Sequence, residues 1–236
     1  MPKKSDTKQF QGLLADFFAF FTDLAANNER AWFQANKTRY EESVMRPMTL
    51  LVADMAPRLL RVSKHYVADP KRSLFRVYRD VRFSKDKSPY KTHAAAQFRH
   101  EVGRDVHAPG FYVHAAPGDI FIGGGMWMPP APQLKAVRDT IARRTSEWRK
   151  TIQDKAFVKT YGGLSDAAEY TLKRPPKGYD PAHPAIADLK RTSFVFGIAA
   201  TEAQAKKPDF IDRIEAAFTA ARPPMRFLCK ALGLPF

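Results

Sequence analysis

The sequence predicts an α+β fold in which helices towards both ends of the chain flank a central, mostly antiparallel sheet. Apolar residues recur at helical spacing before residue 62 and again after residue 131. Between these regions, residues 110–129 form two β-rich arms around the turn residues Pro117, Gly118 and Asp119, which predicts a β-hairpin. No repeat or low-complexity linker divides the 236 residues, so we predict one domain over 1–236, with 1–9 as a flexible basic tail.

Each helical region divides at a polar residue or a proline. The apolar residues between Leu13 and Leu24 predict a first helix, and Asn28 is a suitable N-cap for a second helix over 29–45. A third helix is expected over 47–61, with a bend or break near Pro57. In the second half of the chain, the same spacing predicts helices over 131–144, 146–157 and 208–221, the last of which closes the regular structure.

Two further segments complete the predicted β-rich region. SFVFGIAA (193–200) is predicted to be a buried strand, and the Pro-rich segment 169–184 a loop with a short strand at its start. GGGMWMP (123–129) lacks the Lys-Ser/Thr ending of a P-loop and does not match GxGxxG. We therefore expect its glycines to allow close approach of other backbone after the hairpin, with Trp127 and its neighbouring methionines packed beneath.

Composition excludes several classes of protein. The single cysteine, Cys229, excludes an internal disulfide and a Cys-based zinc cluster, which suits a reducing compartment. The most apolar N-terminal stretch contains Asp16 and Asp23, and no apolar run reaches the length of a membrane span. The basic opening has no apolar signal-peptide region after it. We expect a soluble, cytoplasmic protein with no membrane partner.

The positive charge is concentrated in one region. The net charge is +15, and between Lys71 and Arg104 there are ten basic and three acidic residues, so seven of the surplus charges lie in this short part of the chain. Such a surplus attracts polyanions without identifying them.

Residues 75–93, FRVYRDVRFSKDKSPYKTH, carry much of this charge. From Leu74 to Phe83 apolar and polar residues alternate with a period of two, which predicts a strand, and a proline-containing turn follows it. One predicted face is apolar and carries Phe75, Val77, Val81 and Phe83. Arg76, Tyr78, Asp80 and Arg82 alternate with it. Arg79 is an exception on the apolar face, where an unpaired guanidinium would be costly. Its partner should be a distant carboxylate or a bound anion, with the carboxylate favoured about two to one because structural ion pairs also occupy such positions.

The same segment resembles the signature of the DUF2461 family, also called TIGR02453. The matching positions are Arg76, Arg79, Asp80, Arg82, Phe83, Asp86, Lys87 and Tyr90. Further similar stretches, including NNERAWFQANKTRYEE (27–42) and LKRPPKGYDPAHPAIADLKRTSF (172–194), extend the resemblance over nearly the whole chain. The family is one of uncharacterised function, so the resemblance implies no catalytic residues.

Three functional hypotheses follow from the chemistry of these residues. The preferred one is a pocket for a phosphate- or carboxylate-bearing ligand, since arginine forks suit both groups. The predicted ligand-binding residues are Arg76, Arg79, Asp80, Arg82, Lys87, Tyr90, Lys91 and His93. We assign no cofactor and no metal ligands.

The first alternative is nucleic-acid binding, because aromatic residues are interleaved with the basic ones. The second is a metal-dependent phosphoesterase using nearby acids and histidines. Its candidates are Asp80, Asp86, His93, His100, Glu101, Asp105, His107 and His114, which follow no recognised metal-ligand order.

Overall fold

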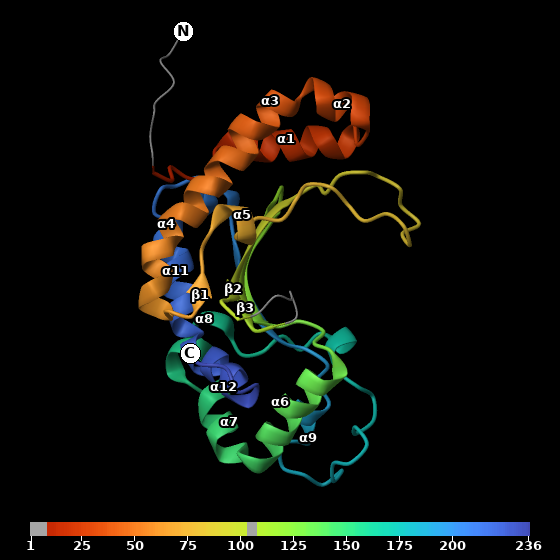
Figure 1. The fold of residues 1–236 in the computed structure, drawn as a ribbon, viewed down its shortest axis with the longest axis vertical. Helices are drawn as coiled ribbons and strands as arrows, with labels where there is room; N and C mark the ends of the chain where they lie inside the picture. The colour runs from red at the N-terminus through yellow and green to blue at the C-terminus, as the bar shows by residue number, and fades with distance from the viewer. Residues whose placement is uncertain (1–8, 103–107) are drawn as a thin grey trace.

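The computed structural model describes residues 9–102 and 108–236, so almost all of the predicted basic tail lies outside the described residues. The α+β prediction is confirmed: helices gather towards both ends of the chain around one antiparallel sheet (Figure 1). The sheet order is β1-β2-β3-β4-β5, the order of the strands in the sequence. The strands are β1 (Tyr66–Val67), β2 (Ala94–His100), β3 (Gly110–Ala116), β4 (Asp119–Met126) and β5 (Phe194–Ala200).

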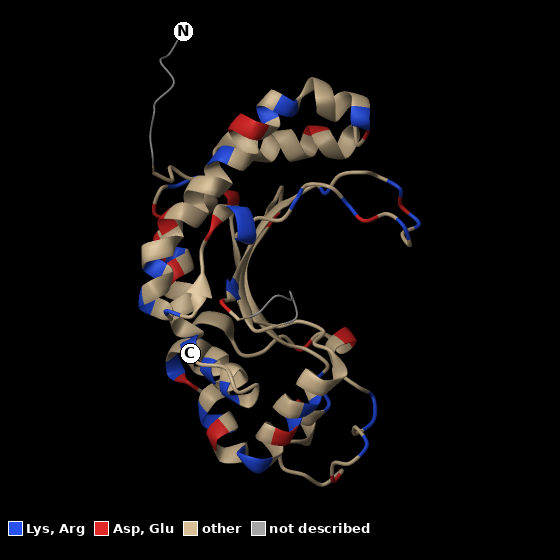
Figure 2. Cartoon of the chain, viewed as in Figure 1, with Lys and Arg blue, Asp and Glu red and all other residues tan. Residues whose placement is uncertain are grey.

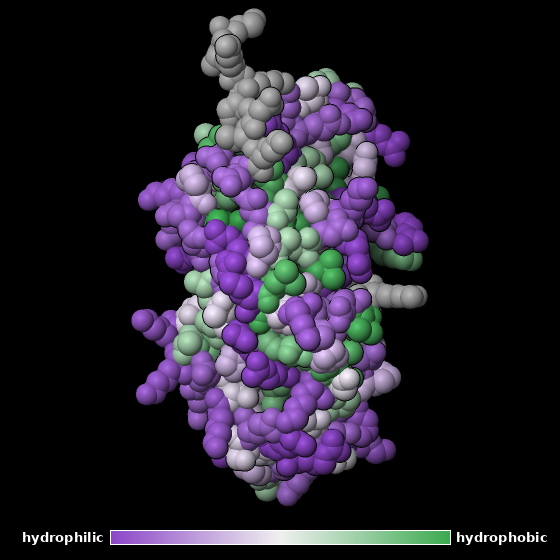
Figure 3. Space-filling view, turned by 60° about the vertical axis from the view of Figure 1, so that its left-hand side comes forward, coloured by the Kyte–Doolittle hydropathy of each residue, from purple (hydrophilic) through white to green (hydrophobic). Residues whose placement is uncertain are grey.

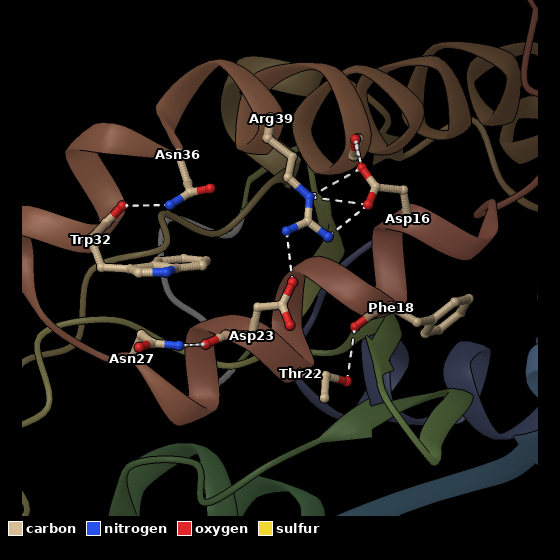
Figure 4. Close-up of polar contacts among 9 residues, drawn as sticks. Asp16, Phe18, Thr22, Asp23, Asn27, Trp32, Asn36 and Arg39 are labelled. Carbon is tan, nitrogen blue, oxygen red and sulfur yellow. Dashed lines mark hydrogen bonds and ion pairs between the residues drawn. The ribbon is translucent and has the colours of Figure 1, made fainter.

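The first N-terminal helices lie beyond one end of the sheet, and the last of them runs down along the helix-covered side of the sheet (Figure 1). They are α1 (Ala15–Ala26), α2 (Arg30–Ala35), α3 (Lys37–Tyr40), a π-helical turn (Glu41–Met45) and α4 (Arg46–Val62). Arg39 joins α3 to α1, because its Nη2 lies 2.6 Å from Asp16 Oδ1 and its Nη1 lies 2.7 Å from Asp23 Oδ2 (Figure 4). The second predicted helix is interrupted between α2 and α3. Near Pro57, where a bend or break was expected, α4 continues without a break.

The predicted N-cap is corrected by the structure. Glu29, not Asn28, is the N-cap residue of α2, and its side chain makes no capping hydrogen bond. The Asn28 amide instead bonds the backbone of Tyr90, sixty-two residues away. The Asn28 side chain therefore makes a long-range contact with Tyr90 instead of the predicted capping contact with the helix.

The C-terminal half contributes a second group of helices. These are α6 (Ala131–Arg143), α7 (Thr145–Ile152), α8 (Lys155–Tyr161), α9 (Ile186–Leu189), α10 (Glu202–Ala205), α11 (Phe210–Ala220) and α12 (Arg222–Ala231). The predicted helix over 146–157 divides at Asp154, whose side chain caps α8. Regular structure does not end with α11, because Pro223 and Pro224 begin α12 in the first turn, where proline is tolerated.

One face of the sheet is covered by helices and forms the main core. Phe218 of α11 packs against Phe98 and Phe111, at ring-centroid distances of 5.5 and 4.5 Å, and Phe157 of α8 packs against Phe196 at 5.2 Å. Figure 3 turns the left-hand side of Figure 1 forward. On that side hydrophilic residues predominate, and hydrophobic ones gather near the middle of the molecule.

The other face carries the alternate residues of the strands, including Gln97, Tyr112, His114 and Phe121; we call it the open face. Register places Gln97 opposite Tyr112 and His114 opposite Phe121. The predicted buried strand, β5, is buried only in part, since Gly197 is exposed. Within the described residues, none of the helices combines the length and apolar character that crossing a membrane requires.

The hairpin prediction is confirmed by β3 and β4, and the three glycines lie within β4, not after it. A Cβ at Gly125, where φ is 114°, would lie 2.0 Å from the carbonyl oxygen of Phe194 in β5. Close backbone approach therefore does require glycine here. Trp127 and Met128, predicted to pack beneath, are instead substantially exposed.

The predicted strand over 74–83 is wrong. Residues 78–89 project from the body of the molecule as an extended arm with no regular strand (Figure 1). Apart from the bridge between Tyr78 and Tyr90, the described part of the arm pairs with no neighbouring strand. Alternation of apolar and polar residues predicts a strand only where another strand is available for hydrogen bonding. Phe83, predicted to face the core, is 96% exposed at this arm.

Candidate anion-binding site

The structure separates the predicted site residues into three groups, the first of which lies on the arm. Arg79 forms an ion pair with Asp86, and Arg82 Nη2 lies 2.7 Å from Asp80 Oδ2. Lys87 Nζ donates a hydrogen bond to the carbonyl oxygen of Val81 at 2.9 Å. The Arg79–Asp86 pair and the Lys87 hydrogen bond therefore join the two limbs of the arm, whereas the Arg82–Asp80 pair lies within one limb.

The partner of Arg79 is thus a carboxylate seven residues along the chain, one of the two alternatives that the sequence left open. The expected deep burial is wrong, because the Arg79 side chain is 28% exposed. Hydrogen bonds from Arg79 lower the pKa of Asp86, and those from Arg82 lower the pKa of Asp80 to about 2. Both carboxylates are therefore ionised at neutral pH, and both arginines have protein anions as partners.

The second group is Tyr90, which anchors the base of the arm. Its ring is buried and stacks on Phe33 with the centroids 4.1 Å apart. Asn28 Nδ2 donates to the Tyr90 carbonyl oxygen at 2.9 Å, and the Tyr90 N–H donates to Asn28 Oδ1 at 3.1 Å. Tyr90 is a structural anchor in this geometry.

The third group comprises Arg76, Lys91 and His93, which lie at the base of the arm and beside the open face. Arg76 lines a cavity of about 520 Å³, which we call the cationic pocket. Its lining residues are Val67, Lys71, Arg72, Ser73, Leu74, Phe75, Arg76, Gln97 and Arg99. Four of these side chains are cationic and none is acidic.

Among the described residues, no Asp or Glu lies within ion-pair distance of the four cations of the cationic pocket. Arg99 Nε donates to Gln97 Oε1 at 3.1 Å, and its guanidinium carbon lies 5.9 Å from the centre of the Phe75 ring. A concentration of like charge is favourable only with counterions or a bound anion.

Lys91 is not among the lining residues of the cationic pocket, but it contacts two of them. Its Nζ donates to the Arg76 carbonyl oxygen at 2.9 Å and lies 5.5 Å from the centre of the Phe75 ring. Burial lowers the pKa of Lys91, and the charge of Arg76 acts in the same direction. Phe75 therefore has two cations against its ring.

Sequence reasoning missed Arg99, Gln97, Lys71 and Arg72 as site residues. Alternation in AAAQFRH (94–100) was the available signal, because it places Gln97 and Arg99 on one face and Phe98 on the other. Three successive alanines have weak β propensity and obscured the strand. The bridge between Leu74 and Ala96 then brings Arg76 beside this strand.

His93 extends the site onto the open face. Its ring lies 4.4 Å from that of His114, whose Nε2 lies 3.5 Å from Asp119 Oδ2 and whose Nδ1 lies 3.5 Å from the Tyr112 hydroxyl. Burial, helped by His114 and Lys91, lowers the pKa of His93 to about 4. Burial also lowers the pKa of His114, so both rings are neutral at pH 7.

The remaining phosphoesterase candidates that the structure describes do not assemble into one site. His100 is buried and its Nε2 lies 2.8 Å from the Pro235 carbonyl oxygen, whereas Glu101 bonds His65. Asp105 and His107 lie outside the described residues. Within the part of the chain that the structure describes, no three His, Cys, Asp or Glu side chains are grouped so that they could hold a metal ion.

Comparison with known proteins adds a family. No curated protein and no solved structure matches the chain. A family model described as "Conserved hypothetical protein (DUF2461)" matches residues 16–227, which include the N-terminal helices, the arm and the sheet. Because this match covers most of the chain, the protein belongs to the DUF2461 family.

Proposed function

We propose that this protein binds a ligand carrying a phosphate or carboxylate group, and that the anionic group occupies the cationic pocket. The supporting observation is the set of four cationic side chains, from Lys71, Arg72, Arg76 and Arg99, that line the pocket without an acid. Arginine donates in a planar fork that matches both groups, so Arg76 and Arg99 are the principal donors in this proposal.

The proposal keeps Arg76, Lys91 and His93 from the predicted site and gives the other members structural roles. Arg79, Asp80, Arg82 and Lys87 shape the arm through their mutual bonds. Tyr90 anchors it. Metal-dependent phosphoester hydrolysis is not part of the proposal, because the two nearby carboxylates already accept hydrogen bonds from arginines.

Calorimetric titration with inorganic pyrophosphate at low salt tests the proposal. The site variant is Arg76→Gln with Arg99→Gln, and the charge-matched control is Lys173→Gln with Lys177→Gln, on the exposed loop between η2 (Ala168–Tyr170) and α9. Hydrogen bonds to charged groups contribute about 1.5–3 kcal/mol each, so the site variant should bind at least tenfold more weakly than wild type. The control should match wild type within twofold. Equal weakening in both variants would mean that general charge, not the pocket, binds the anion.

A further inference from the structure

The arm presents aromatic rings to solvent. Phe83 is 96% exposed and Tyr78 is 51% exposed, although both belong to a segment whose base is buried. The Arg82 guanidinium carbon lies 5.8 Å from the centre of the Phe83 ring, and Figure 2 shows further basic residues along the arm. Neither ring is buried in the core of this chain, so both are available to a partner.

The arm is held in shape by its own bonds. At its base, Arg79 N–H donates to the Pro89 carbonyl oxygen at 2.9 Å and Lys91 N–H donates to that of Val77 at 2.7 Å. Nearer the tip, Asp86 accepts from Arg79 and from Ser88. A segment that is already ordered loses less conformational entropy when it binds a partner.

Of the two exposed rings, Tyr78 lies next to the cationic pocket. Tyr78 lines a second cavity of about 510 Å³, which shares Phe75 and Arg76 with the cationic pocket. Phe75 in turn lies 6.1 Å from Tyr112 on the open face, measured between ring centres. Aromatic and cationic side chains follow one another along the chain from the arm back to the sheet. We call this series, together with Tyr112, the aromatic track; its other members are Phe83, Arg82, Arg79, Tyr78, Arg76 and Phe75.

We infer that the anionic partner is a single-stranded nucleic acid that lies along the aromatic track with a phosphate in the cationic pocket. This inference rests on the proposed function of that pocket. Unpaired bases stack on exposed aromatic rings whatever their sequence, while basic side chains neutralise the phosphates. A small anion would occupy the pocket and leave Phe83 and Tyr78 without a role, and a duplex keeps its bases stacked on one another.

Charge and dimensions agree with this partner. The chain carries +15, which attracts a polyanion and disfavours a second copy of the same protein. Between Phe75 and Phe83 an extended chain spans at most roughly 26 Å, to which the open face adds further length. Such a track suits a site of several nucleotides, within the range of about 4–16 known for single-strand binding folds.

Fluorescence anisotropy with labelled 12-nucleotide oligothymidylate and a 12-base-pair duplex tests the inference over a series of salt concentrations. The track variant is Tyr78→Ala with Phe83→Ala, and the control is Leu60→Ala, at an exposed apolar residue on α4. Wild type should bind the single strand more tightly than the duplex. The track variant should lose at least tenfold in affinity for the single strand with little change in salt slope, because it removes stacking and no charge. Leu60→Ala should bind as wild type does.

The pocket variant Arg76→Gln with Arg99→Gln should weaken both oligothymidylate and pyrophosphate, and should reduce the salt slope for the oligonucleotide by about 1.4. If pyrophosphate binding depends on the pocket but oligothymidylate binding is unaffected in the track variant, the inference fails and the proposed function stands. Absence of pyrophosphate binding refutes the proposed function itself. Binding of phosphatidylserine vesicles that depends on Phe83, without oligothymidylate binding, would also overturn the inference.

Discussion

Asn28 is the side chain whose replacement should most directly release the base of the arm. Its amide makes two hydrogen bonds to the backbone of Tyr90, at 2.9 and 3.1 Å, and so joins the turn after α1 to the end of the arm. Asn28→Ala removes both bonds and leaves the Tyr90 N–H and carbonyl oxygen without these partners at a partly buried position. The neighbouring Asn27 provides a matched control, because its amide bonds only the Asp23 carbonyl oxygen at an exposed site.

The expected magnitude follows from the bonds lost. Each intramolecular hydrogen bond contributes about 0.5–1.5 kcal/mol to the free energy of unfolding, so Asn28→Ala should cost about 1–3 kcal/mol. In a protein of this size, 1 kcal/mol corresponds to a shift in Tm of about 2–4 °C, which gives an expected decrease of roughly 2–12 °C, about 6 °C at the midpoints of the two ranges. Asn27→Ala should lower Tm by at most about 3 °C, because water replaces its single exposed bond.

Thermal unfolding and limited trypsin digestion together test this reasoning. Tm gives the global effect. The rate of cleavage after Arg79 and Lys87 reports opening of the arm, since local opening exposes backbone to proteases. Cleavage should be faster in Asn28→Ala than in wild type and unchanged in Asn27→Ala. Equal Tm values and equal cleavage rates for the two variants would show that the Asn28 amide does not hold the arm, and the reasoning would be refuted.

The remaining predictions concern the open face and the close approach of β4 to β5. The pKa of His93 is about 4 in the folded protein and about 6.5 in the unfolded chain. Between these pH values the unfolded chain binds more protons, so the free energy of unfolding should fall as the pH is lowered from 6.5 to 4. NMR titration measures the pKa of His93, and a value near 6.5 would contradict the prediction. Urea midpoints of wild type and His93→Gln at pH 7 and pH 5 measure the effect of this residue on stability. Gly125→Ala should cost more than about 2 kcal/mol, because the added Cβ would strike the Phe194 carbonyl oxygen at a positive φ. Gly197→Ala is the control, because the atoms nearest to its added Cβ would be 3.7 Å away, and it should change stability by less than about 0.5 kcal/mol. Chemical denaturation measures both variants, and equal losses of stability at the two glycines would contradict the close-approach argument.

Local patterns were sufficient for the elements whose signals are local. The helical spacing of Phe17, Phe21 and Leu24 reflects one buried face of α1, and the Pro-Gly-Asp turn forms the hairpin between β3 and β4. The period of two over 74–83 wrongly predicted a strand, because a strand also needs a hydrogen-bonded neighbour and this segment leaves the sheet.

Sequence patterns were enough to predict the fold class, the hairpin and the concentration of positive charge around residues 71–104. Which of those charges lie close to one another depends on the three-dimensional arrangement of the chain. Arg79 and Arg82 form ion pairs with carboxylates within the arm. Pairing of Leu74 with Ala96 instead brings Arg76 beside Arg99 in a pocket whose described lining residues include no acid. The physical reason is that ion pairing depends on distances of a few ångströms between side chains. Where the backbone is neither helix nor strand, the spacing of residues along the sequence does not determine those distances.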